Sequence, residues 1–329
     1  MSSELPQIYF YLEERDKPVH VLEKVDLTQQ SFGLDTTYNW TLQTYLRLKA
    51  NGLPCTLTGT MPAEGIVLAV RGNLPFDLKP NPKLLVVCMR ADGGFHPYAQ
   101  IHIVQNPTQV KADSYFMPHW PEPGLIPRED SRGETFKVAA YIGAEVNLAP
   151  ELQSEAWRRQ ATALGLEWRL VSESARMNDY RDIDVVVAVR SFDHNAYSHK
   201  PASKLYNAWR AGVPAILGPE SAYRAERRNE LDYLEVRTLE EVISSLKKLG
   251  ANSSLRQAMI VNGFERAAEI ETELLIERWC KFILMTVVPA YRRWIDMSSI
   301  ESTLFMLHRY LNLRWSGLCY RALGAKDQI

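Results

Sequence analysis

The stretch HKPASKLYNAWRAGVPAILGPESAY, residues 199–223, decides the fold class. Its pattern predicts a helix over 202–212, which stops at Gly212, followed by an apolar strand over 213–218. The apolar run IDVVVAV, residues 183–189, predicts another strand just before the stretch. A strand, a helix and a strand at this spacing are typical of a parallel, doubly wound sheet, whose ligands bind beyond the carboxyl ends of the strands.

The same alternation extends through most of the chain. Further strands are predicted at 7–14, 55–59, 66–70, 83–89, 100–105, 137–143 and 167–171, and further helices at 37–52 and 150–165. Several of these strands are too continuously apolar for a sheet with one wet face. Between residues 117 and 134, four prolines and two glycines interrupt a run without apolar periodicity, which indicates a linker.

These patterns predict two domains of the α/β class. We expect a first domain over 1–118, a linker over 119–135, a second domain over 136–290 and a C-terminal helical segment over 291–329. We also expect the C-terminal segment to pack back on the first domain. A length of 329 residues is sufficient for two cores of ordinary size.

The composition excludes several classes of protein. A net charge of −1 lacks the basic excess of a general nucleic-acid binder, so we expect a small-molecule or glycan partner and no nucleic acid. The four cysteines are scattered and form no C-x-x-C pair, which argues against a zinc site and favours a reducing, cytoplasmic setting. The sequence shows neither a signal-peptide pattern nor a run near the ~18 apolar residues of a spanning helix. We therefore expect a protein that is neither secreted nor transmembrane.

Basic and hydroxyl side chains gather around the predicted helix. Arg190 follows a strand at its carboxyl end, and Lys200, Ser203 and Lys204 lie just before the helix or in its first turn. A helix N-terminus carries unpaired N–H groups and a partial positive charge, so the three cations are placed to converge on a diphosphate. The alternative is that the lysines are solvated and Ser203 is an ordinary first-turn residue. Spacing alone leaves both interpretations open.

The segment SKLYNAWRAGVPAILG, residues 203–218, with Arg190 before it, resembles the donor site of GT-B-fold glycosyltransferases. The resemblance covers order and spacing over about 137–266, and LRQAMIVNGFERAAEI, residues 255–270, is similar to the helical region that closes those domains. In addition, FMPHWPEPGLIPR, residues 116–128, resembles a glycosyltransferase-related family from bacterial polysaccharide-synthesis loci.

The resemblance implies two Rossmann-like domains facing a cleft. The first would bind a glycan or lipid-linked acceptor and the second a nucleotide-sugar donor, which is a substrate, with no separate cofactor. Asn207 stands where many members carry a glutamate that meets the nucleotide ribose; asparagine can still hydrogen-bond a hydroxyl, but as a neutral group. Glu220 and Ser221 correspond to the loop that binds donor-sugar hydroxyls, although they could equally cap the following helix.

A competing motif is DID, residues 182–184, which superficially matches a metal-binding D-x-D. Both carboxylates precede the apolar run VVVAV, residues 185–189, so they are predicted at the sheet edge opposite the ligand. We therefore expect no metal. Without one, Arg190 and Lys204 would neutralise the departing nucleoside diphosphate.

The acceptor side offers two candidate bases. Asp35 lies between the first strand and its helix, and Asp92 follows the strand over 83–89, so both are predicted at the ligand-facing end of the first sheet. The alternatives are a helix cap for Asp35 and a turn residue for Asp92. His102, His119 and Trp120 are weaker candidates, because a lone histidine in an apolar strand is usually part of the core.

The segment after Tyr291 carries six Lys or Arg residues against three Asp or Glu residues, with interleaved aromatics at Phe305, Tyr310, Trp315 and Tyr320. Packing on the first domain is the favoured interpretation, and peripheral contact with an anionic membrane is the alternative. Two rivals to a glycosyltransferase remain: a nucleotide-sugar epimerase of the same fold and a non-catalytic nucleotide- or glycan-binding protein. A nicotinamide dehydrogenase is disfavoured, because no G-x-G-x-x-G follows the first strand of either domain.

Overall fold

The computed structural model describes residues 4–14, 18–29, 32–75, 77–78, 81–193 and 195–323, and leaves aside the side chains of residues 313 and 316–323. The chain divides into two compact units. Unit 1 comprises Met1–Val25, Asp35–Trp120 and Glu273–Ile329, and unit 2 comprises Asp26–Leu34 and Pro121–Thr272. The chain therefore passes four times from one unit to the other.

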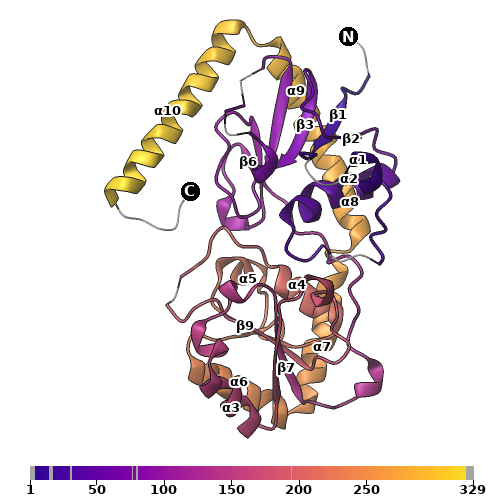
Figure 1. The fold of residues 1–329 in the computed structure, drawn as a ribbon, viewed down its shortest axis with the longest axis vertical. Coiled ribbons are helices and arrows are strands. Elements are labelled where there is room, and N and C mark those ends of the chain that lie inside the picture. Colours follow the sequence, from indigo (N-terminus) through magenta and orange to yellow (C-terminus); the bar gives the residue numbers. More distant parts are fainter. Residues whose placement is uncertain are drawn as a thin grey trace. The chain divides into compact units, whose positions relative to one another are not determined.

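Unit 1 is built on a six-stranded sheet whose neighbouring strands all run parallel. Its strands are β1 (Ile8–Tyr11), β2 (Thr56–Thr58), β3 (Gly65–Val70), β4 (Leu84–Met89), β5 (Ile101–Val104) and β6 (Ser114–Phe116). They are arranged in the order β2-β1-β3-β4-β5-β6 (Figure 1). Every residue of β3 and β4 is buried, which explains why GIVLAV and LLVVCM are unbroken apolar runs.

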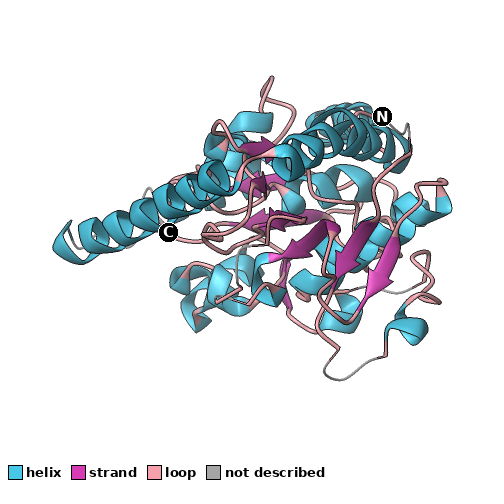
Figure 2. Cartoon of the chain, turned by 90° about the horizontal axis from the view of Figure 1, so that it is seen from above, coloured by secondary structure: helices cyan, strands magenta, loops and turns pink. Residues whose placement is uncertain are grey.

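The helices of unit 1 come from both ends of the chain. They are α1 (Val19–Leu22), α2 (Gln43–Ala50), α8 (Thr272–Phe282), α9 (Val288–Asp296) and α10 (Ser299–Leu323), with π-helical turns at Tyr38–Leu42 and Ile283–Val287. Helix α9 packs against β3 and β4, and Trp279 of α8 stacks on Trp120 with ring centroids 6.3 Å apart. Figures 1 and 2 show α10 as one unbroken helix. Among the described residues, no helix is both long and apolar enough to cross a membrane.

Unit 2 is built on a five-stranded parallel sheet in the order β11-β10-β9-β7-β8. Its strands are β7 (Val138–Ile142), β8 (Glu167–Val171), β9 (Val185–Ala188), β10 (Ala215–Leu217) and β11 (Leu234–Glu235). The first strand, β7, has the second on one side and the third on the other. The strand order therefore reverses between β7 and β9, which is the switch point where doubly wound sheets bind ligands.

Five helices complete unit 2: α3 (Glu155–Ala163), α4 (Ser203–Ala211), α5 (Ser221–Glu226), α6 (Leu239–Ala251) and α7 (Ser253–Ala268). Helix α3 begins where the Ser154 side chain accepts a hydrogen bond from the Trp157 amide. Helix α4 ends at Gly212, whose φ of 66° is the left-handed conformation of a helix C-cap. The core includes Trp157 and Trp168 in an edge-to-face contact, with centroids 5.4 Å apart.

The predicted fold class is confirmed: both units are α/β with parallel sheets, and the C-terminal region is helical. Strands β6 and β11 are missing from the prediction, and residues 150–153 form a 3-10 turn before α3 instead of its first turn. The compact units do not follow the expected domain ranges. Unit 2 ends at Thr272, because the segment that begins at Glu273 makes its contacts within unit 1. Unit 2 also includes Asp26–Leu34.

Candidate functional site

The candidate site lies at the carboxyl ends of β7 and β9, at the switch point of unit 2. Gly143 follows β7 with a φ of 140°, a conformation that side chains rarely adopt. A Cβ atom at this position would lie 2.9 Å from the Nζ atom of Lys204 and 3.2 Å from the hydroxyl of Tyr141. The glycine therefore leaves room for the lysine ammonium at the end of β7.

Lys204 reaches this point from the first turn of α4. The helix begins at Ser203, and the preceding residue, Ala202, has no side-chain oxygen to cap it. The positive end of the helix thus adds to the charge of the ammonium group. The Nζ atom also lies 5.2 Å from the centroid of the Tyr141 ring, a cation–π contact that supports its position.

Arg190, just after β9, is held by a buried carboxylate. Its Nε atom donates to Glu220 Oε2 at 2.8 Å, and its Nη1 atom donates to the side-chain oxygen of Asn147. The side chain of Arg190 is 10% exposed and that of Glu220 is 2% exposed, so the ion pair is largely shielded from water. The guanidinium group further lies 5.7 Å from the ring centroid of Tyr197. These contacts fix the orientation of the guanidinium group.

Charge at the site is unbalanced in favour of cations. Burial raises the pKa of Glu220, and the charge of Arg190 opposes this rise, as do Lys204 and Lys200. Three cations thus act on the Glu220 carboxylate, and Asp193 adds a second carboxylate near Tyr197. Burial also raises the pKa of the Tyr141 hydroxyl, so this group stays neutral. The arrangement is suited to binding an anion.

Of the remaining predicted donor residues, Ser203 and Ser221 adjoin Lys204 and Glu220 along the chain. Ser203 is the first residue of α4 and Ser221 the first of α5, where the Ser221 amide donates to the Ala196 carbonyl. Glu220 precedes α5 without a side-chain capping bond, so its carboxylate serves Arg190 and not the helix. Asn207 shares a hydrogen bond with the hydroxyl of buried Tyr180.

Asp35, in unit 1, occupies the position of a helix cap. Its carboxylate accepts a hydrogen bond from the Tyr38 amide at 3.0 Å, and its carbonyl accepts one from the Asn39 amide. The carboxylate is thus engaged by the backbone at the start of the helix, as the capping alternative predicts.

Asp92 is exposed, after a residue, Ala91, with a φ of 48°. Its carboxylate accepts a hydrogen bond from Gln105 Nε2 at 2.8 Å. Burial lowers the pKa of His119, and the charge of Asp92 partly opposes this. His119 also packs edge-to-face on Trp40. A carboxylate and an imidazole are therefore neighbours near the carboxyl ends of β4 and β6. By contrast, His102 is fully buried, and burial is the main reason its pKa falls to about 3.

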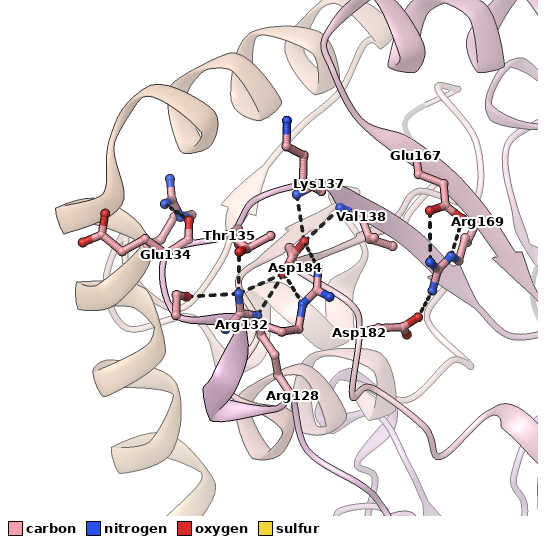
Figure 3. A network of polar contacts seen from close by, with 12 residues as sticks. Arg128, Arg132, Glu134, Thr135, Lys137, Val138, Glu167, Arg169, Asp182 and Asp184 are labelled. Atoms are coloured by element: carbon pink, nitrogen blue, oxygen red, sulfur yellow. Dashed lines mark hydrogen bonds and ion pairs between the residues drawn. The ribbon is translucent and has the colours of Figure 1, made fainter.

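The DID motif forms a structural network, shown in Figure 3. Asp184 accepts hydrogen bonds from the guanidinium groups of Arg128 and Arg132 and from the backbone amides of Lys137 and Val138. Asp182 pairs with Arg169 instead. Both carboxylates precede β9, at the edge opposite Arg190. Within the described part of the chain, no three His, Cys, Asp or Glu side chains are grouped as metal ligands.

Three residues at the site are absent from the sequence prediction: Tyr141, Asn147 and Tyr197. Tyr141 lies within the apolar strand β7 and is indistinguishable from a core aromatic by pattern. Asn147 belongs to a short 3-10 turn without a recognisable motif. Tyr197 has a φ of 45°, which the sequence does not signal. Only their spatial relation to Arg190 and Lys204 identifies them.

No protein-family model matches the chain, and no curated protein sequence matches it. Among solved structures, it is similar to TarM of S. aureus at 12% identity and a TM-score of 0.48, over 73% of this chain and 58% of TarM. It is also similar to HepE of Anabaena, solved with UDP and glucose, at 10% identity and a TM-score of 0.47, over 85% of this chain and 100% of HepE.

A third similar structure is WaaG, a glycosyltransferase involved in lipopolysaccharide biosynthesis, at 13% identity and a TM-score of 0.43, over 84% of this chain and 99% of WaaG. The chain thus spans less than two thirds of TarM but nearly all of the other two. At identities of 10–13% and TM-scores below 0.5, these similarities assign neither a family nor a ligand to this chain.

Proposed function

We propose that this protein is a glycosyltransferase that moves a sugar from a nucleotide-activated donor to a glycan or lipid-linked acceptor, without a metal ion. The observation that carries the proposal is the cluster of Arg190, Lys204 and the N-terminus of α4 at the switch point of unit 2. A doubly wound sheet binds ligands at this place, and a net positive cluster there favours a diphosphate.

The cluster is suited to the leaving group of glycosyl transfer. As the bond between sugar and diphosphate breaks, negative charge grows on the diphosphate oxygens, and groups that stabilise this charge lower the barrier. Lys204 supplies a point charge next to the end of β7, where Gly143 leaves the space. Arg190 is already oriented by Glu220 and Asn147, so little reorganisation accompanies the reaction.

The other residues around the cluster take supporting roles in this proposal. Asn207 and Ser221 would hydrogen-bond hydroxyls of the ribose and the donor sugar, while Lys200 and Ser203 would extend the diphosphate site. Glu220 is chiefly a positioning residue, because its carboxylate is engaged by Arg190. The scattered, unpaired cysteines favour a cytoplasmic location.

Unit 1 would bind the acceptor, and Asp92 is the better of the two candidate bases. Both carboxylates are exposed, but that of Asp35 caps a helix through the Tyr38 amide, whereas that of Asp92 accepts from Gln105 and lies beside His119. A base must be free to take a proton from the acceptor hydroxyl, and the capping role of the Asp35 carboxylate therefore favours Asp92. Asp92→Asn should therefore lower turnover by roughly 10²- to 10⁴-fold if transfer inverts the anomeric carbon.

Thermal-shift measurements with UDP, GDP, ADP and dTDP test the donor site. One of these nucleotides should raise the melting temperature, because a ligand at 100 times its Kd adds about 2.7 kcal/mol of stability. Lys204→Ala should weaken this response by roughly 10- to 100-fold in Kd, whereas Lys247→Ala, an exposed lysine on α6, serves as the matched control. No response to any of the four nucleotides would count against the proposal.

A second measurement separates the transferase from its rivals. Release of nucleoside diphosphate that depends on added acceptor indicates transfer. Interconversion of the nucleotide-sugar without acceptor indicates an epimerase, and binding without turnover indicates a non-catalytic protein.

A further inference from the structure

Helix α10 presents a line of large apolar side chains to solvent. These residues, which we call the outer stripe, are Ile300, Leu304, Leu307, Leu311 and Trp315. Their exposed fractions are 74%, 58%, 49%, 54% and 70%, values far above those of core residues. Successive members are four, three, four and four residues apart, so they share one face of the helix. An exposed apolar surface of this length marks a site of interaction.

The opposite face of α10 is fixed to unit 1, which determines the direction of the outer stripe. Arg309 donates to the Gln100 carbonyl at 3.1 Å and pairs with Asp113. Phe305 packs on Trp294 of α9, with ring centroids 5.5 Å apart. These anchors turn the outer stripe away from unit 1. Phe305, one of the interleaved aromatics of this segment, belongs to the packed face, as the favoured interpretation of the segment predicts.

The spacing of the outer stripe favours a flat apolar surface over a partner helix. A coiled-coil seam repeats every 3.5 residues, so the position after Leu311 would be residue 314. That residue is Arg314, which is exposed, and the stripe continues at Trp315 instead. The average spacing between successive apolar residues from Ile300 to Trp315 is therefore close to the 3.6 residues per turn of a straight helix. Such a helix keeps its apolar face toward a flat surface without a supercoil.

The charges around the outer stripe complement an anionic surface. Arg314 borders the stripe and lies 5.7 Å from the ring centroid of Tyr310, and Arg292 and Arg293 are exposed on α9. From Tyr291 to the end of the chain, and leaving out Arg309 because it pairs with Asp113, five Lys or Arg residues oppose three Asp or Glu residues. A tryptophan and a tyrosine beside basic residues are typical of helices that lie at the interface between water and lipid.

We propose that α10 docks this protein on the surface of an anionic lipid bilayer, with the outer stripe between the headgroups and the acyl chains. The helix lies parallel to the surface, and the arginines contact lipid phosphates. This proposal does not rest on the proposed function, because docking needs neither a donor nor sugar transfer. The two ideas are compatible, since docking through unit 1 would bring a lipid-linked acceptor close to that unit.

Sedimentation of the full-length protein with vesicles tests the proposal. The protein should bind vesicles of phosphatidylcholine mixed with phosphatidylglycerol, and bind those of phosphatidylcholine alone more weakly. Leu307→Asp should reduce binding to the mixed vesicles on the order of 10- to 100-fold, because it removes a leucine that lies in the lipid when the helix is docked and puts a charge in its place. The matched control is Val261→Asp on α7, a site with 48% exposure compared with 49% for Leu307.

Charge reversal provides an independent variant. Arg314→Glu should reduce binding to the mixed vesicles by roughly 10-fold and leave binding to phosphatidylcholine unchanged, and added salt should shrink the difference. Lys247→Glu on α6, also exposed, should change neither. Because Arg314 and Leu307 are both exposed, melting temperatures within about 2 °C of the wild type should confirm that the variants fold.

Three outcomes would overturn the proposal. The first is a wild-type protein that binds neither kind of vesicle. The second is equal loss of binding in Leu307→Asp and Val261→Asp. The third is a dimer in sedimentation velocity that Leu307→Asp dissociates, since a second copy of this chain would then cover the outer stripe.

Discussion

Replacing Asp184 with asparagine should destabilise unit 2 strongly, whereas the same change at Asp182 should have little effect. The side chain of Asp184 is 1% exposed and accepts six hydrogen bonds, four from guanidinium groups and two from backbone amides. Asp182 is 46% exposed and pairs with Arg169. The two carboxylates stand two residues apart, so each variant is a close control for the other (Figure 3).

The size of the effect follows from what asparagine cannot do. One of its two terminal groups is a donor, so either the amides of Lys137 and Val138 or the guanidinium groups would face an N–H group. Arg128 and Arg132 would also lose their counter-charge. Removing one partner of a buried ion pair costs about 3–5 kcal/mol, compared with at most about 1 kcal/mol for an exposed pair. At about 2–4 °C per kcal/mol, Asp184→Asn should lower the Tm of unit 2 by roughly 6–20 °C.

Differential scanning calorimetry measures the loss, and amide hydrogen exchange locates it. In Asp184→Asn, the amides of Lys137 and Val138 should lose protection first, since their acceptor is the altered group. Asp182→Asn should lower the Tm by at most about 4 °C and leave these amides protected. Small and equal losses in the two variants would refute the view that Asp184 joins the start of β7 to the segment carrying the two arginines.

Three further predictions concern the charged groups of unit 2. Hydrogen bonds from Arg132 and two backbone amides outweigh burial and hold the pKa of Asp184 below its ordinary value. The stability that this carboxylate contributes is therefore full above the unfolded pKa of about 3.9 and is lost as pH falls through the folded pKa. Tm measured against pH should show this loss in acid for the wild type, and Asp184→Asn should lack it. Arg190→Ala should lower stability by about 3–5 kcal/mol, because it removes the ion-pair and hydrogen-bond partner of buried Glu220, and adding Glu220→Gln should restore part of it in urea unfolding; a double variant no more stable than the single one would contradict this. Gly143→Ala should weaken nucleotide binding by roughly 10-fold in titration calorimetry, because the new methyl group displaces the Lys204 ammonium; unchanged affinity would mean that Lys204 does not contact the ligand.

The strands could be predicted from the sequence wherever a fully buried strand is an unbroken apolar run. Strands β3 and β4 are buried along their whole length, so their composition alone predicts buried parallel strands. Strands β6 and β11 contain three and two residues and exist because β5 and β10 offer them an edge to pair with, a property of the sheet and not of the segment. The unit boundaries depend on contacts as distant as Trp120 with Trp279, which no local pattern reports.

The candidate site divides in the same way. The order of the predicted elements along the chain placed Arg190 beyond the end of a strand and Lys204 in the first turn of a helix. It also predicted the alternative role of Asp35 as a helix cap, which the hydrogen bond from Tyr38 supports. The partners of Arg190 did not follow, because Glu220 is 30 residues away and Asn147 is 43 residues away. Their proximity depends on the order in which the strands pair.

The four passages of the chain between the units constrain how the protein is made on the ribosome. Unit 2 has all of its segments once residue 272 has been synthesised, whereas unit 1 also requires the segment that begins at Glu273. The apolar strands β3 and β4 must therefore wait for α9, which packs against them, until all of unit 2 has been synthesised. A nascent chain would therefore expose the face of the sheet that α9 covers throughout the synthesis of unit 2. Cutting the gene at the segment after Trp120 would yield two fragments, each lacking part of its own unit.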